Sequence, residues 1–222
     1  MPESDASMQP NVEALTQGDV PIPRLKLGQS SFNGLWTAAG TIVEECNSEL
    51  RWPMCMQTYK KMAKDATIAP ALNLVEMAIA RVPWSVKIPE GYEEQLKDKA
   101  EFLRQVMNDM DHSWGSFIRQ ATSFNRFGFA PVEKVYRKRY KKNGSKHDDG
   151  LVGLKSLPLI AQDTVSSWEW QEGGRELAGL NQYAVEPSGK RGVMTSSWKE
   201  EFIPVKKFML IRNNPLKNNP EG

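Results

Sequence analysis

The segment Phe124–Tyr140, FNRFGFAPVEKVYRKRY, decides the fold class because the pattern of the chain changes within it. Apolar residues recur at helical spacing before Gly128, whereas strand-like runs dominate after it. A glycine in this position is well suited to end a helix, because it tolerates the left-handed backbone conformation of a helix terminus. We therefore expect an α+β fold, with N-terminal helices followed by a mostly antiparallel sheet, rather than alternating strands and helices.

Working outward toward the N-terminus, helices are expected over residues 58–65, 66–82, 93–110 and from Ser113 to Gly128. Asp65 and Ser113 are suitable N-caps, and Pro70 falls in a first helical turn, where its missing N–H is tolerated. Pro83 ends the second helix, and WSVKI (84–88) is expected to be a short strand.

Each of the longer helices carries an apolar stripe, which is typical of a face that packs into a core. The stripes are Leu72, Val75, Ile79 and Val82; then Leu96, Ala100, Leu103, Met107 and Met110; then Trp114, Ile118, Ala121 and Phe124.

Working outward toward the C-terminus, residues 129–140 are expected to form a strand that returns over 151–157 through the polar loop 141–150. A second hairpin is expected from SSWEWQ (166–171) and ELAGLNQYAV (176–185), with Trp168 and Trp170 on one face. Residues 186–200 are expected to be a long loop. The strand at 206–212 is apolar on both faces, which predicts a central position in the sheet.

The bulk properties restrict the class of protein. A net charge of +2 is too small for a general binder of polyanions. No apolar run is long enough to cross a membrane, and the N-terminus lacks the pattern of a signal peptide, so we expect no membrane contact. Residues 1–30 are polar and rich in proline and glycine, which is typical of a flexible N-terminal arm; the alternative is an arm that swaps a strand or binds a partner.

Catalytic and metal-binding signatures are missing from the sequence. There is no phosphate-binding glycine loop, no G-x-S-x-G and no His-Glu-x-x-His, so we expect neither an enzyme nor a cofactor. Cys46 and Cys55 imply no disulfide framework, although a bridge between them stays open. If an unrecognised catalytic site exists, its candidates are Asp148, Asp149 and His112.

The stretch Tyr136–Lys146 carries six basic residues and no acidic one. Arg137, Arg139 and Lys141 share one side of the expected strand, which is typical of a solvated or edge-protecting face. The alternative is that these three side chains contact phosphate groups. Such contacts would be independent of base sequence and sensitive to salt.

Several segments together resemble the portal proteins of tailed bacteriophages, in particular those of Mu-like phages. The resemblance covers about residues 58–222. It depends on the order and spacing of several segments rather than on any one motif. The similar segments are TYKKMAKDATIAPALNLVEMAIARVPWSV (58–86), FNRFGFAPVEKVYR (124–137), LKSLPLIAQDTVSSWEWQEGGRELAGLNQYA (154–184) and KFMLIRNNPLKNNPEG (207–222).

The resemblance implies a closed homo-oligomeric ring of about twelve subunits at one vertex of the capsid. Such a ring would be located in the virion, and in the host cytoplasm during assembly. It would be the channel for DNA packaging and ejection, would let double-stranded DNA pass through without sequence-specific contacts, and would hydrolyse nothing. Its partners would be the terminase motor, the major capsid protein and head–tail connector proteins.

Within that plan, residues 31–222 would be a wing-like region that stops before the stem and clip. The family turn would fall on the Asn-Pro residues that follow the last strand: Asn213, Asn214, Pro215, Asn219, Pro220 and Gly222. The alternative function is an adaptor protein that binds nucleic acid without sequence specificity through Arg137, Arg139 and Lys141.

Overall fold

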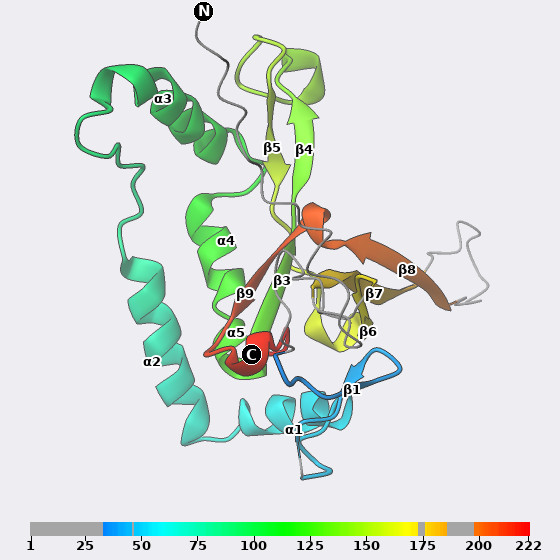
Figure 1. Cartoon of the computed structure of the whole chain (residues 1–222). Coiled ribbons are helices and arrows are strands. Elements are labelled where there is room, and N and C mark those ends of the chain that lie inside the picture. Colours follow the sequence, from blue (N-terminus) through cyan, green and yellow to red (C-terminus); the bar gives the residue numbers. More distant parts are fainter. Residues whose placement is uncertain (1–32, 46, 173–175, 186–197) are drawn as a thin grey trace, which may run out of the picture. The chain divides into compact units, whose positions relative to one another are not determined.

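The computed structural model describes residues 33–45, 47–172, 176–185 and 198–222. Helices precede the main strands, and all strand pairs among these residues are antiparallel, so the predicted α+β fold is confirmed (Figure 1). The expected N-terminal arm, residue Cys46 and most of the expected loop 186–200 lie outside the described residues. The helices are α1 (Met54–Met62), α2 (Ile68–Arg81), α3 (Glu93–Asp109), α4 (Trp114–Ala121) and α5 (Phe124–Phe127).

The strands form four small sheets rather than one. The short strands β1 (Thr37–Ala38) and β2 (Thr41–Ile42) pair with each other. The other sheets are β3 (Phe129–Glu133) with β9 (Phe208–Arg212), β4 (Val135–Lys138) with β5 (Val152–Ser156), and β6 (Val165–Trp170), β7 (Leu177–Val185) and β8 (Trp198–Pro204) in that order. Both hairpins expected from the sequence, β4–β5 and β6–β7, are therefore present.

Capping residues set the helix boundaries much as expected. The Ser113 hydroxyl accepts a hydrogen bond from the Ser116 N–H at 3.1 Å, which caps α4. The Asp65 carboxylate accepts from the backbone N–H groups of Thr67 and Ile68, at the start of α2. Gly128 ends α5 with a φ of +85°. The fourth expected helix is interrupted, because α4 ends at Ala121 and α5 begins at Phe124.

Three of the expected strands were wrong in extent or position. Residues 84–88 form no strand, and the Val86 carbonyl accepts from the Arg104 guanidinium instead of a neighbouring strand. The expected strand 129–140 divides at Lys134, whose N–H donates to the Lys207 carbonyl, so β3 and β4 join different sheets. The strand β9 pairs only with β3 among the described residues, so it is not central.

The strand β8 replaces the end of the expected loop 186–200. The run of charged residues Lys199, Glu200 and Glu201 hides the alternation of polar and apolar residues that is typical of a strand. All seven residues of β8 nevertheless pair in register with β7. Long-range pairing with a neighbouring strand outweighs the weak local preference of lysine and glutamate for strands.

Two apolar clusters form the core, and β3 contributes to both through Phe129 and Val132. The Phe129 ring lies 6.0 Å from that of Trp52 and 5.4 Å from that of Trp168, measured between centroids. Trp168 and Trp170 both pack on the first cluster, as expected for one face of a strand. The larger cluster comprises Ile42, Trp52, Cys55, Met56, Phe129, Ile160, Val165, Trp168, Leu180 and Phe208.

The apolar stripe expected to bury α2 is the main error in the predicted core. No residue of α2 is buried among the described residues, although Ile79 and Ala80 touch the second cluster. Val75 and Val82 are about half exposed, at 48% and 52%. No helix in the described ranges is long and apolar enough to cross a membrane.

Candidate functional site

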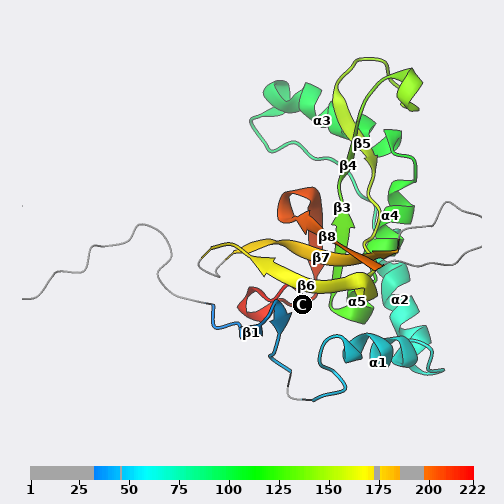
Figure 2. The same ribbon diagram turned by 90° about the vertical axis from the view of Figure 1, so that its right-hand side faces the viewer.

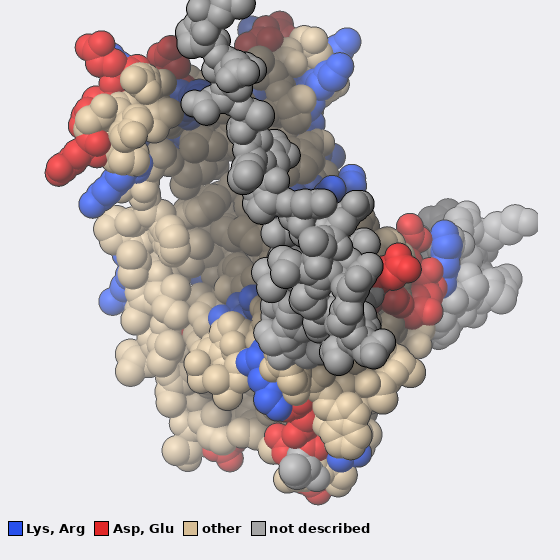
Figure 3. Space-filling view, in the orientation of Figure 1, with Lys and Arg blue, Asp and Glu red and all other residues tan. Residues whose placement is uncertain are grey.

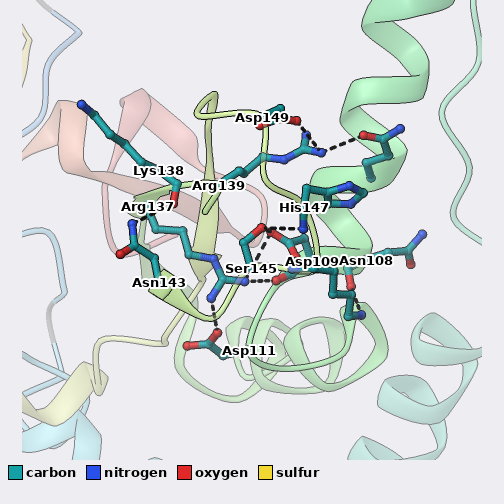
Figure 4. Close-up of polar contacts among 12 residues, drawn as sticks. Asn108, Asp109, Asp111, Arg137, Lys138, Arg139, Asn143, Ser145, His147 and Asp149 are labelled. Atoms are coloured by element: carbon teal, nitrogen blue, oxygen red, sulfur yellow. Dashed lines mark hydrogen bonds and ion pairs between the residues drawn. The ribbon is translucent and has the colours of Figure 1, made fainter. Parts of the chain in front are cut away.

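The β4–β5 hairpin lies against α3, and the contact between them is polar (Figures 1, 2 and 4). The expectation of a solvated basic face was wrong here. Arg137 is only 9% exposed and Arg139 is fully buried, because both point toward α3. The exposed side chains of this strand are Tyr136 and Lys138 on the other face. Glycine at position 153, opposite Arg137 in the register, leaves room for the aliphatic stem of Arg139, because a Cβ atom there would lie 3.2 Å from Arg139 Cδ.

Arg137 joins the hairpin to the end of α3 and the residues just after it. Its Nη1 donates to Asp111 Oδ1 at 2.7 Å, and its Nη2 lies 3.4 Å from Asp109 Oδ2. The Nη2 atom also donates to the Asp109 backbone carbonyl, which has no further helical partner. The guanidinium therefore pairs with the carboxylates of Asp109 and Asp111 and also provides a hydrogen-bond donor to a backbone carbonyl at the C-terminus of α3.

Asp109 is the shared acceptor of a polar cluster that also contains Arg137, Ser145 and Lys146. Its carboxylate accepts from Ser145 Oγ and from the Lys146 backbone N–H, each at 2.7 Å, and it is 2% exposed. Burial alone would raise the pKa of this carboxyl. The two hydrogen bonds and the charge of Arg137 outweigh burial, so the pKa of Asp109 lies below its ordinary value.

Arg139 contacts α3 about one turn closer to the N-terminus of the helix than Asp109 does. Its Nη2 donates to Gln105 Oε1 at 2.8 Å and lies 2.9 Å from Asp149 Oδ2, while its guanidinium carbon lies 5.0 Å from the centre of the Phe102 ring. Its Nε and Nη1, and the Nε of Arg137, are buried with no hydrogen-bond partner among the described residues. The two arginines thus hold the hairpin to α3 at a real cost in desolvation.

Of the three residues expected to contact phosphate, only Lys141 is exposed, in a short 3₁₀ turn at Lys141–Asn143. Contact of Arg137 or Arg139 with phosphate would require breaking their ion pairs with Asp109, Asp111 and Asp149. Phosphate contact stays a prediction, and Lys141 is the side chain with access to solvent.

The residues proposed for an unrecognised catalytic site have separate structural partners. His112 Nε2 accepts a hydrogen bond from the Leu157 N–H at 2.9 Å, which links the segment before α4 to the residue that follows β5. Asp149 pairs with Arg139, and Asp148 accepts from the Lys141 N–H at 3.4 Å. Within the described ranges, no group of three histidine, cysteine or acidic residues is placed to hold a metal ion.

The C-terminal residues fold back onto the turn at Gly128. The Asn213 N–H donates to the Gly128 carbonyl at 2.8 Å, directly after β9 ends. Asn214 then adopts a left-handed conformation with a φ of +45°, which asparagine tolerates better than most residues. Arg212 Nη1 donates to Asn218 Oδ1 at 2.8 Å, and Pro220 is buried.

Glu221 is a feature that the sequence did not indicate. Its Oε1 accepts from Trp168 Nε1 at 3.0 Å, beside a cavity of about 190 Å³ that Trp52, Cys55 and Tyr59 also line. Burial raises the pKa of Glu221 to about 7, and the hydrogen bond from Trp168 opposes this only in part. Burial, together with the nearby Glu221, raises the pKa of Cys55 to about 11, which disfavours the thiolate form.

One signal for the polar cluster was present in the sequence. Asp109 is the last residue of α3, where the negative end of the helix dipole disfavours an acidic side chain unless a cation lies nearby. For Glu221 no comparable signal exists, because an acid in an Asn-Pro-rich turn is ordinarily solvated.

Comparison of the sequence with known protein families gives a match. The model of the family described as the portal protein of Mu bacteriophage matches residues 56–222, which is most of the chain. The chain therefore belongs to the Mu-type family of phage portal proteins, a family of structural proteins. No match to a curated protein reaches significance.

Proposed function

We propose that this chain is a subunit, or the N-terminal portion of a subunit, of a portal ring at one vertex of a phage capsid. The match of the family over residues 56–222 carries the proposal. In this role the protein forms the channel for DNA packaging and ejection, and it is the platform for the terminase motor and the head–tail connector. A closed ring of about twelve copies would have cyclic symmetry.

The chemistry of the described residues supports a passive role. The acidic and histidine candidates for catalysis already have structural partners, and the buried arginines are engaged by carboxylates. The net charge of +2 suits a ring through which DNA slides better than one that grips DNA tightly. Such contact with DNA would be independent of base sequence.

The alternative, an adaptor that binds nucleic acid through the basic hairpin, has less support. It requires three cationic side chains on an open surface, whereas Arg137 and Arg139 are buried in ion pairs. The exposed Lys141 alone would supply only a weak and salt-sensitive contact.

The proposal predicts that the complete gene product assembles into a ring. Light scattering coupled to size-exclusion chromatography should give a mass of about twelve subunits, and negative-stain images should show a ring with rotational symmetry. A protein that stays monomeric at micromolar concentration, with a cooperative unfolding transition, would contradict the portal function.

A further inference from the structure

The helix α2 lacks the polar face that a surface helix ordinarily has. Its sequence, IAPALNLVEMAIAR, contains only Asn73, Glu76 and Arg81 as polar residues, yet none of its residues is buried among the described ones. A helix that is apolar on nearly all sides is normally enclosed. The exposed side of α2 therefore requires a covering surface.

The side of α2 that faces the rest of the chain is already defined. The Glu76 carboxylate accepts two hydrogen bonds from Arg126, at 2.6 and 2.8 Å, and Ile79 and Ala80 touch the second core cluster. The solvent-exposed side, here called the α2 stripe, adjoins this contact side at Val75 and Val82, and its residues recur at spacings of three, four and seven. The α2 stripe consists of the exposed residues Ala71, Leu74, Val75, Ala78 and Val82.

The α2 stripe is large enough to be half of a stable interface. Leu74 is 66% exposed, and Met77 and Trp84 beside the stripe are 52% and 54% exposed. Together the exposed apolar side chains offer on the order of 500 Å². One side of a standard interface buries about 800 Å², of which somewhat more than half is apolar. Figure 3 shows a mostly uncharged surface over α2.

A second exposed apolar surface lies on the outer face of the β6–β7–β8 sheet. The Phe202 ring lies over Gly179, where a Cβ atom would come within 2.6 Å of it, and Phe202 is still 50% exposed. The register places Tyr183 on the same face, at 47% exposure. Glu169 and Glu200 flank these rings and are exposed. We call this surface the sheet patch.

We propose that the α2 stripe of one subunit docks on the sheet patch of the next copy of this chain. A helix laid on a sheet face is a common way to bury both apolar surfaces. Their charges are complementary: Arg81, exposed beside the stripe, forms no ion pair with any described residue, whereas the sheet patch is flanked by carboxylates.

The two surfaces are on different elements, so the contact is head-to-tail rather than two-fold symmetric. Head-to-tail contacts generate closed rings when the rotation between copies closes. The inference rests on the proposed function, because it assigns the contact that would build the portal ring. In Figure 1, α2 lies on the left and β8 on the right, on separate sides of the described chain.

Two variants of the complete gene product test this contact. Leu74→Glu places a charge in the α2 stripe, and Phe202→Glu places one in the sheet patch. Each should raise the concentration at which half of the chains assemble by about 30-fold or more, since a central apolar contact is worth at least about 2 kcal/mol. Leu103→Glu is the matched control, because Leu103 is 50% exposed on α3 and belongs to neither surface.

A mixture of the two variants distinguishes the head-to-tail contact from a symmetric one. The intact stripe of the Phe202→Glu chain should bind the intact sheet patch of the Leu74→Glu chain, which gives heterodimers and nothing larger. A symmetric contact between two stripes would give no such heterodimer, and its absence overturns the inference. Far-UV circular dichroism and the melting temperature establish that each variant is folded, and Leu74→Ser and Phe202→Ser replace any that is not.

Failure of this inference differs from failure of the portal function. A wild-type ring that survives Leu74→Glu or Phe202→Glu overturns the assigned contact and leaves the ring intact. A monomeric wild-type protein overturns the ring, and with it the contact. Dissociation of the Leu103→Glu control together with both variants would also overturn the assignment, because it would show no preference for the two surfaces.

Discussion

Gly128 is the residue at which a helix, a strand and the C-terminal segment meet. Its φ of +85° ends α5, and its carbonyl accepts the Asn213 N–H at 2.8 Å. A Cβ atom at this position would lie 2.3 Å from the Glu221 carbonyl oxygen, well inside van der Waals contact. Both the backbone conformation and the packing therefore require glycine.

Replacing Gly128 with alanine should destabilise the protein by more than about 2 kcal/mol, because it adds backbone strain to a steric clash. The measurement is the free energy of unfolding in urea. Gly115→Ala is the matched control: Gly115 lies within α4 and its Cβ would meet nothing within 4 Å. That change should stabilise by about 0.5–1 kcal/mol, since alanine favours a helix. Equal effects of the two changes would contradict this account.

Glu221 should make stability depend on pH near neutrality. Its pKa is raised to about 7 from 4.5, so between these values the folded chain holds a proton that the unfolded chain has released. The contribution of Glu221 to the free energy of unfolding is therefore full below the pKa of the unfolded state. It is lost as pH rises through the pKa of the folded state, by up to about 3 kcal/mol.

Glu221→Gln tests this dependence, since glutamine cannot ionise and keeps an acceptor for Trp168 Nε1. The variant should match the wild type at pH 5 and exceed its free energy of unfolding at pH 8. Parallel pH profiles of the two proteins, measured by urea denaturation, would show that Glu221 is not the group responsible.

Among the elements, the β4–β5 hairpin and α3 are unusual in being joined by charge. Arg137, Arg139 and Asp109 are buried between them, and Val106 is the buried aliphatic side chain of α3 that meets Gly153. Buried ion pairs add little net stability over an apolar contact, but they fix one geometry because any other leaves a charge unpaired. The cluster thus determines how the hairpin is seated on α3.

Asp109→Asn should cost about 3 kcal/mol, because it leaves Arg137 buried with a weaker set of partners. Asp98→Asn is the control, on an exposed position of the same helix, and should change stability by less than about 0.5 kcal/mol. Chemical denaturation of both variants gives the comparison.

The Asp109 contribution should also be lost as pH falls through its lowered pKa, since the carboxylate is the form that the fold stabilises. A small effect of Asp109→Asn would mean that the cluster is dispensable.

The elements themselves were largely predictable because local chemistry determines them. Ser113 and Gly128 mark helix boundaries through hydrogen bonds and backbone conformation that depend on one residue each. The strand β8 was missed because its charged residues resemble a loop, and the strand expected at 84–88 does not form. Strand formation depends on a partner that is distant in sequence, which no local pattern contains.

At the scale of the whole molecule, sequence patterns could identify apolar and basic faces but not what covers them. Val75 and Val82 of α2 were expected in the core and are about half exposed, whereas Arg137 and Arg139 were expected on the surface and are buried. Both errors have the same physical origin. Periodicity tells which side chains share a face, but burial depends on which element packs against that face. The assembly proposed above would cover the α2 stripe.

The pairing of β3 with β9 has a consequence for how the chain is made. Phe129 lies in the main core cluster, and so does Phe208 at the start of its partner strand. Local contacts let the helices form early in synthesis, but this pair closes a long loop and must wait until residues 208–212 have left the ribosome. A nascent chain that stops before Phe208 exposes both an unpaired strand edge and an apolar core surface. Premature termination there should yield aggregates that a host chaperone or protease removes.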